Sequence, residues 1–180
     1  MSKVDASRIL VTRGGWDGHT PVESTDLFIA WMKEQGFGVD VHDTLDPYLD
    51  ADLMSAADLV VQCVTMSEIA PKQEKGLLDA IRAGTGFAGW HGGVIDSFRK
   101  HTEYQWMTGG QWVAHPGNCI PDYVVDIVDR DHPITAGIDA FTLRDTEQYY
   151  MHVDPGNHVL CATTFSGEHG ESGLYPAGGP

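Results

Sequence analysis

The sequence lacks any hydrophobic run long enough to cross a membrane. A spanning helix needs roughly 18–20 consecutive apolar residues, and no stretch of the chain approaches that length. Residues 1–8 are polar and lead directly into a short apolar segment, so we also expect no signal peptide. On these grounds we expect no membrane partner.

Basic residues are also scarce. Lys and Arg total 11 against 26 Asp and Glu, which gives a net charge of −15 with histidine neutral. Binding to a phosphate backbone relies on clustered Lys and Arg, so we expect no nucleic-acid partner. A neutral or cationic small ligand suits this negative field better.

Cysteines are few and far apart in the chain. The three, Cys63, Cys119 and Cys161, form no C-x-x-C pair and no disulfide framework. Cys63 and Cys161 lie in apolar runs, where a free thiol packs as a small hydrophobe. We therefore expect all three to be structural, in a reducing, cytoplasmic protein.

The chain does contain alternating strand and helix patterns, and its 180 residues suit a single domain. Apolar runs predict strands at 8–12, 37–41, 58–64 and 86–90. Thr20 and Pro21 predict the capping and first residues of one helix, and Pro71 opens a second helix that ends at Gly84. The first helix carries an apolar stripe of Leu27, Phe28, Trp31 and Met32.

This order predicts an α/β fold, doubly wound, with a mostly parallel sheet and helices on both faces. Further along the chain we expect a helix at 96–107 and strands at 123–128 and 158–162. Ligands of such sheets bind beyond the carboxyl ends of the strands. The loops at 14–19 and 90–93 both follow predicted strands, so they are the first places to look for a site.

The most informative segment is Gly89-Trp90-His91-Gly92-Gly93, at the end of the predicted strand 86–90. Gly-x-nucleophile-x-Gly is the spacing of the sharp strand-to-helix elbow that raises one side chain at a sheet edge. Here the raised residue, His91, is neither Ser nor Cys, so the usual acyl-transfer chemistry does not apply. An elbow is a costly backbone feature, and we therefore expect His91 to be functional.

An overlapping glycine motif does not indicate nucleotide binding. Residues 84–89 match G-x-G-x-x-G. In dinucleotide sites these glycines follow a strand and open a helix. Here they follow a helix and run through a strand, so the context is inverted and we reject this reading.

Other polar and aromatic residues lie on loops that such a fold would bring together. We take His19, His115 and Glu147 as further catalytic candidates, since imidazoles and carboxylates serve as general acids and bases. Residues suited to stacking on a sugar ring or bonding to it are assigned to substrate binding: Trp16, Trp90, Gln111, Trp112 and Tyr149.

A divalent metal such as Zn²⁺ is also possible, and its ligands would be His19, His91 and His115. No H-x-H or H-E-x-x-H spacing supports it, so we commit to no cofactor. We expect His132 to be a turn residue before Pro133. Three other histidines have no supporting context in the sequence: His101, His158 and His169.

These segments resemble the trehalose-utilisation (ThuA-like) family, a branch of the class I glutamine amidotransferase-like fold, which is flavodoxin-like in its doubly wound sheet. In that family a glycine-flanked His stands where amidotransferases carry Cys. The resemblance covers nearly the whole chain, and it rests on the His19 loop and on residues 86–93, 107–117, 131–135 and 147–150.

The resemblance implies disaccharide catabolism alongside sugar 3-dehydrogenases, and hence a keto-sugar as substrate and a sugar dehydrogenase as a possible partner. Similar proteins continue past residue 180 with further strands. We therefore expect residues 1–180 to form one C-terminally short ThuA-like domain that lacks those strands, and we expect a homo-oligomer.

We accordingly expect a carbohydrate-processing enzyme that acts on a keto-glycoside or disaccharide by proton transfer, as an isomerase or epimerase. His91 or Glu147 would be the general base, and His19 and His115 would polarise the carbonyl or hold a metal. One alternative is a non-catalytic sugar-binding or interaction domain of the same fold. A third is an amidotransferase-like hydrolase, for which Cys63 would have to be the nucleophile.

Overall fold

The computed structural model describes residues 7–167 of the chain. It divides into two compact units, Met1–Gln111 and Trp112–Pro180, each of which is described by itself below. The expectation of one domain over the whole chain stays a prediction.

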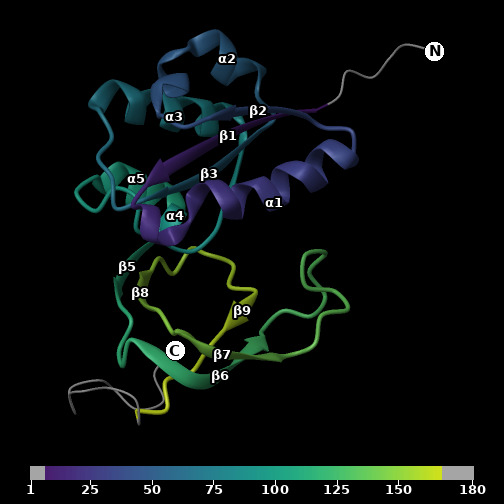
Figure 1. The fold of residues 1–180 in the computed structure, drawn as a ribbon, viewed down its shortest axis with the longest axis vertical. Coiled ribbons are helices and arrows are strands. Elements are labelled where there is room, and N and C mark those ends of the chain that lie inside the picture. Colours follow the sequence, from purple (N-terminus) through teal and green to yellow (C-terminus); the bar gives the residue numbers. More distant parts are fainter. Residues whose placement is uncertain (1–6, 168–180) are drawn as a thin grey trace. The chain divides into compact units, whose positions relative to one another are not determined.

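The first unit is built on a parallel four-stranded sheet in the order β2-β1-β3-β4 (Figure 1). This is the expected doubly wound α/β arrangement, because each crossover between parallel strands carries helical structure. The strands are β1 (Arg8–Gly15), β2 (Gly38–His42), β3 (Leu59–Thr65) and β4 (Gly86–Gly89). The α-helices are α1 (Pro21–Glu34), α2 (Ala51–Ala56), α3 (Pro71–Ala83), α4 (Gly92–Ile95) and α5 (Thr102–Thr108), with short 3₁₀ helices at Asp17–His19 and Asp46–Leu49.

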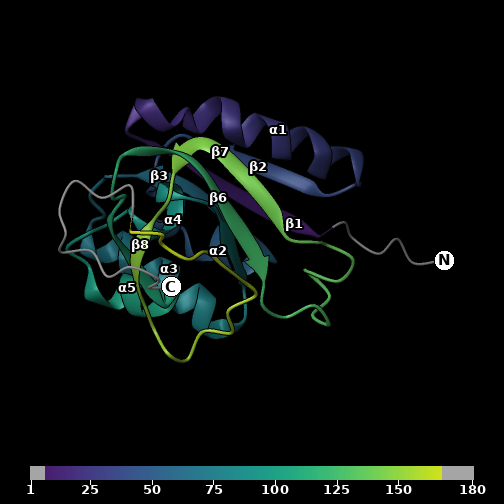
Figure 2. The same ribbon diagram turned by 90° about the horizontal axis from the view of Figure 1, so that it is seen from below.

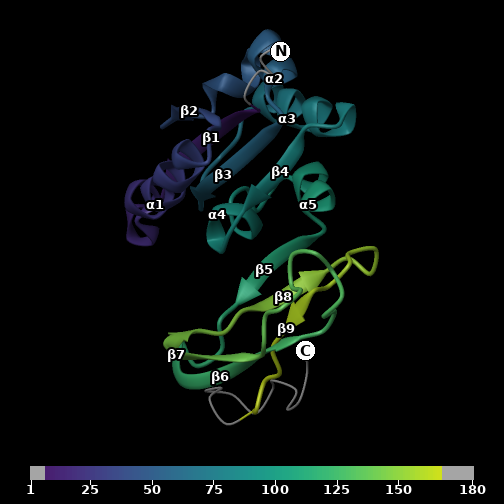
Figure 3. The same ribbon diagram turned by 90° about the vertical axis from the view of Figure 1, so that its right-hand side faces the viewer.

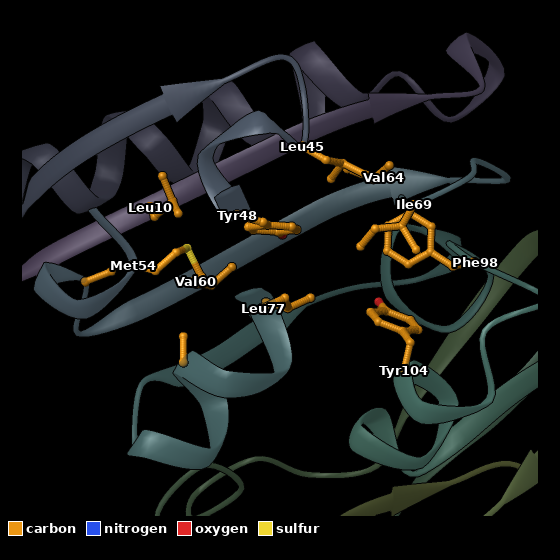
Figure 4. Close-up of a cluster of buried hydrophobic side chains, with 12 residues drawn as sticks. Leu10, Leu45, Tyr48, Met54, Val60, Val64, Ile69, Leu77, Phe98 and Tyr104 are labelled. Carbon is orange, nitrogen blue, oxygen red and sulfur yellow. The ribbon is translucent and has the colours of Figure 1, made fainter. Parts of the chain in front are cut away.

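Successive side chains of the central strands enter two different cores. Leu10 and Val60 pack with residues of α2, α3 and α5, whereas Val11 and Val61 pack with Ile29 of α1. This follows from the period of two along a strand. The ribbon accordingly has α1 on one face of the sheet and α2 and α3 on the other (Figure 1), and the larger of the two cores is drawn in Figure 4.

Helix α1 starts and stops where the sequence predicts, but the expected capping by Thr20 is wrong. Thr20 adopts a left-handed φ of 45° and its side chain makes no capping hydrogen bond. The predicted apolar stripe is largely exposed: of its members only Met32 is buried. The buried face instead includes Thr25, whose hydroxyl donates to the carbonyl of Pro21 at 2.6 Å and is thereby satisfied in the core.

The single helix expected at 96–107 is also wrong, because the chain breaks between α4 and α5 (Figure 3). The carbonyl of Asp96 accepts the backbone N–H of Met66, and that of Ser97 accepts the N–H of Ser67. Both carbonyls therefore bond to the loop after β3 rather than within a helix. Helix α2 is not predicted from the sequence pattern; Asp50 caps it by accepting two backbone N–H groups.

The second unit consists of antiparallel strands rather than a continuation of the parallel sheet. β6 (Cys119–Ile127) pairs with β7 (Phe141–Glu147) as a long ribbon (Figure 2) and with the two-residue β9 (Cys161–Ala162). β5 (Gly110–Ala114), which starts at the end of the first unit, pairs with β8 (Tyr150–Val153). The strand expected at 123–128 is confirmed, whereas the one at 158–162 shrinks to β9.

No helix in the described part of the chain is long and apolar enough to cross a membrane.

Candidate functional site

His91 occupies a strand-to-helix elbow, as the glycine spacing predicts. Trp90 alone separates it from the end of β4 (Gly86–Gly89), and it stands immediately before α4, with φ 54° and ψ −150°. This combination lies outside the left-handed helical region that Asn, Asp and His visit and is close to one adopted essentially by glycine alone, so it costs of the order of 1–3 kcal/mol. The side chain is exposed at the sheet edge.

The glycines around His91 are required by close approaches. A Cβ on Gly89 would lie 2.3 Å from the carbonyl oxygen of Gln62, and one on Gly93 would lie 2.8 Å from the Cα of Cys63. Both contacts are with backbone atoms, which cannot give way as a side chain can. The elbow therefore packs against β3 only because these positions lack side chains.

His19 lies beside His91 in the first unit. The two imidazole rings have centroids 4.7 Å apart and an interplanar angle of 72°. The Nδ1 of His19 lies 3.1 Å from the Oγ1 of Thr65, and the indole of Trp16 meets the His19 ring edge-on at 4.8 Å. A Cβ on Gly92 would come within 2.9 Å of the His19 ring, so the elbow also makes room for this neighbour.

These residues gather at the carboxyl ends of three parallel strands. Trp16 and His19 follow β1, Thr65 ends β3, and His91 follows β4. In a sheet of order 2-1-3-4 the strand order reverses between β1 and β3, and ligands bind at that reversal. The predicted group Trp16, His19 and His91 is therefore brought together at the position where this fold binds ligands.

A buried polar network ties the elbow helix to β3. Gln62, which is fully buried, accepts from the Tyr48 hydroxyl at 2.9 Å and donates to the Tyr104 hydroxyl at 2.6 Å. Its amide also donates to Ser97 Oγ at 3.0 Å, while the Tyr104 hydroxyl donates to the carbonyl of Val94 at 2.8 Å. Burial raises the pKa of both tyrosines, so they stay neutral donors.

Trp90 does not join the imidazole pair in the described contacts. Its half-buried side chain packs against the core on the α1 side of the sheet, and its ring lies 4.6 Å from that of Phe28. Phe28 is half-exposed, so the two rings form an aromatic surface with one open side.

The second unit gathers another set of predicted residues. His115 Nε2 and Glu147 Oε1 lie 3.5 Å apart, and both side chains are about a quarter to a third exposed. The rings of Trp112 and Tyr149 lie 5.7 Å and 6.4 Å from the His115 ring. His115 follows β5 and Glu147 ends β7, so strand ends again supply the polar groups.

The surroundings of Glu147 are also polar. The Tyr123 hydroxyl donates to the backbone carbonyl of Glu147 at 2.8 Å, and burial followed by the charge of Glu147 raises the pKa of that tyrosine. The Nδ1 of His115 is buried and has no hydrogen-bond partner among the described residues. Gln111, on β5, is half-buried.

The family assignment follows from these motifs and the whole sequence. The ThuA family, described as trehalose utilisation, matches residues 8–178. The chain belongs to the ThuA family. Membership supports a function related to trehalose utilisation. No curated protein matches the chain.

Solved structures confirm the ThuA-like fold. A ThuA-like protein from Bacteroides uniformis superposes with a TM-score of 0.75 at 16% identity, over 93% of this chain and 73% of that one. One from Parabacteroides merdae gives 0.71 at 18% identity, over 94% and 72%. A glutamine amidotransferase from Thermotoga maritima gives 0.57 at 16% identity, over 92% and 69%.

In this ThuA-family chain Cys63 is not placed as an amidotransferase-type nucleophile. It lies within β3, is 2% exposed, and burial raises the pKa of its thiol, which disfavours the reactive thiolate. The expected packing of Cys63 is confirmed, whereas that of Cys161 is wrong, because Cys161 is exposed, as is Cys119.

Two of the prospective metal ligands, His19 and His91, are neighbours in the first unit. Zinc sites use three or four protein ligands, so these two imidazoles make up part of such a set. His115, the third candidate, belongs to the second unit and is described there with Glu147.

The remaining histidines have structural contacts. His158 Nε2 lies 2.8 Å from Asp129 Oδ2, and His132 Nδ1 accepts the backbone N–H of Ile134. His101 pairs with Glu74 at 2.9 Å. His169 lies outside the described residues.

Thr65 and Phe28 are not among the site residues predicted from the sequence. Thr65 is a polar residue that ends an apolar strand at the ligand-binding edge of the sheet, and that position is a signal that the sequence contains. Phe28 could not be found in this way, because its pattern predicts a core residue.

Proposed function

We propose that this ThuA-family chain is a carbohydrate-processing enzyme that acts on a keto-glycoside or disaccharide by proton transfer next to the carbonyl. The observation that carries the proposal is the strained elbow that holds His91 beside His19 at the strand-order reversal. Strained backbone persists where the surrounding structure enforces it, and it clusters at functional sites.

The geometry of the first unit supports the following roles. His91 takes the proton from the carbon next to the carbonyl, and the electron pair of that C–H bond moves onto the carbonyl oxygen. His19 stabilises the resulting enolate oxygen by hydrogen bonding, and the exposed indole of Trp16 stacks on the sugar ring. Delivery of a solvent proton to the opposite face of the carbon epimerises the sugar, and His91 then passes its proton to water. Delivery of the proton by His91 to the former carbonyl carbon isomerises the sugar, provided that the proton of the neighbouring hydroxyl moves to the former carbonyl oxygen. No oxidant is consumed.

In this scheme a sugar dehydrogenase would supply the keto group, since the chain acts on a carbonyl that already exists.

Glu147 is the alternative general base, positioned next to His115. The buried Nδ1 of His115, which lacks a partner among the described residues, favours a ligand in the second unit, because buried polar atoms are normally paired.

The test is turnover of a panel of 3-keto-glycosides by His91→Ala and by the exposed control His152→Ala. A positioned acid or base contributes about 10²–10⁴-fold, so we expect His91→Ala to lose at least 100-fold in kcat and His152→Ala to match the wild type. Unchanged turnover in His91→Ala would rule out the assignment.

The second candidate is a non-catalytic sugar-binding domain, which the half-exposed Phe28–Trp90 surface favours. It predicts that sugars quench tryptophan fluorescence while NMR shows no chemical change. An amidotransferase-like hydrolase is the third candidate, and the burial of Cys63 argues against it.

A further inference from the structure

The hydroxyl of Thr65 makes a specific contact with one nitrogen of His19. Its Oγ1 lies 3.1 Å from Nδ1, and Thr65 is fully buried at the last position of β3. In the neutral imidazole one nitrogen carries the proton and donates, while the other accepts. A hydrogen bond that makes Nδ1 the acceptor therefore puts the proton on Nε2, and one that makes Nδ1 the donor leaves Nε2 unprotonated. The direction of this single hydrogen bond therefore decides what the Nε2 of His19 can do.

Burial of Thr65 decides that direction. A hydroxyl has one proton to donate, and a buried donor without an acceptor is strongly disfavoured. Within residues 7–167 the acceptor that lies in reach of the Thr65 hydroxyl is the Nδ1 of His19. Thr65 therefore donates, Nδ1 accepts, and the proton of the neutral ring is on Nε2.

The His19 ring is held in this orientation by its neighbours. The Cα of Gly92 lies under the ring so closely that a Cβ there would be 2.9 Å from Cε1, and Trp16 meets the ring edge-on. A ring turned by 180° would place a C–H group against the hydroxyl and leave the Thr65 proton unpaired.

We propose that Thr65 is a positioning residue that holds neutral His19 as the Nε2–H tautomer. His19 then presents a hydrogen-bond donor, which suits a carbonyl oxygen and the enolate that it becomes. The role of His19 as a donor to a substrate carbonyl rests on the proposed function, whereas the tautomer itself does not.

A proton on the Nε2 of His19 also disfavours ligation of a metal through that atom. A metal-bound imidazole nitrogen must be unprotonated, and the other nitrogen then donates its N–H to a neighbour. Thr65 would have to accept that bond, and its own proton would lose the acceptor that the described residues provide.

The experiment is long-range ¹H–¹⁵N NMR of the full chain labelled with ¹⁵N-histidine, at pH 8.5, well above the ordinary imidazole pKa of about 6.5. His19→Asn assigns the His19 signals by their loss. We expect the Nε2–H pattern in the wild type and in Thr65→Ser, and a mixture of tautomers in Thr65→Val. An Nδ1–H wild type, or a Thr65→Val spectrum identical to that of the wild type, would overturn the proposal.

Thr12→Val is the matched control. Thr12 is also fully buried, lies on the neighbouring strand β1, and hydrogen-bonds the Tyr48 hydroxyl at 2.7 Å rather than His19. It should leave the His19 pattern unchanged. If Thr65→Val does not fold, the wild-type and Thr65→Ser spectra still decide the tautomer.

Kinetics separate this proposal from the proposed function. On a 3-keto-glycoside we expect Thr65→Val to lower kcat by about 10-fold with little change in KM, and Thr65→Ser to restore kcat. Equal loss in Thr12→Val would make the effect one of stability and refute the positioning role. An Nε2–H tautomer in a chain that turns over no keto-glycoside would refute the proposed function and leave the role of Thr65 standing.

Discussion

Replacement of His91 by glycine should stabilise the protein relative to replacement by alanine. His91 holds φ 54° and ψ −150°, a conformation that glycine adopts without the clash that a Cβ brings. Both substitutions remove the imidazole and all its contacts. Their difference in stability therefore isolates the backbone of the elbow.

The magnitude follows from two opposing effects. Relief of the strain gains about 1–3 kcal/mol, and the greater freedom of glycine in the unfolded chain costs about 0.4–1 kcal/mol. The difference is about 1 kcal/mol in favour of His91→Gly. For a chain of this size that corresponds to a rise in Tm of about 2–4 °C.

The assay is thermal and urea unfolding of His91→Ala and His91→Gly, with the same pair at Glu68 as control. Glu68 is exposed and is not among the residues with positive φ, so there glycine should be less stable than alanine by about 0.5–1 kcal/mol. The same penalty at His91 would show that the elbow is unstrained, and the reasoning would then fail.

Three further predictions concern buried and paired groups. Gln62→Leu should lower the free energy of unfolding by about 3 kcal/mol in urea titrations, since the buried Tyr48 hydroxyl loses its acceptor; a loss below about 1 kcal/mol would contradict this. Cys63 should react with a thiol reagent only in denaturant, because its thiol is buried with a raised pKa, whereas the two exposed thiols react at once; three fast thiols would refute it. The pKa of Asp129 is lowered first by the backbone N–H of Asp131, so Asp129 contributes stability above its unfolded-state pKa of 3.8 and loses it as the pH falls through the lower folded value. The difference in the free energy of unfolding between wild type and Asp129→Asn should therefore shrink as the pH is lowered. A difference that stays constant with pH would contradict this prediction.

The elbow could be predicted from the sequence because its physical requirements are local. Glycines on both sides of His91, at the end of an apolar run, are needed wherever a strand turns sharply against its neighbour. The alternation of strands and helices likewise predicted the parallel sheet, since that pattern leaves few other topologies.

Features that depend on distant partners could not be predicted. The buried face of α1 includes Thr25, whose hydroxyl donates to a carbonyl of the helix backbone. The apolar stripe in the sequence therefore does not mark the buried face of this helix. The break between α4 and α5 depends on the N–H groups of Met66 and Ser67, about 30 residues earlier in the chain. The contact of Thr65 with His19 needs the register of β1 against β3, which local patterns do not contain.

Proton exchange with solvent tests the central claim most directly. A 3-keto-glycoside is incubated with the protein in D₂O, and ¹H NMR follows loss of the proton on the carbon next to the carbonyl. The account predicts deuterium incorporation with the wild type at least 100-fold faster than with His91→Ala, and equal rates in the wild type and His152→Ala. Exchange no faster than in buffer, or equally fast in His91→Ala, would contradict the claim that this chain moves a proton from the carbon next to a sugar carbonyl by means of His91.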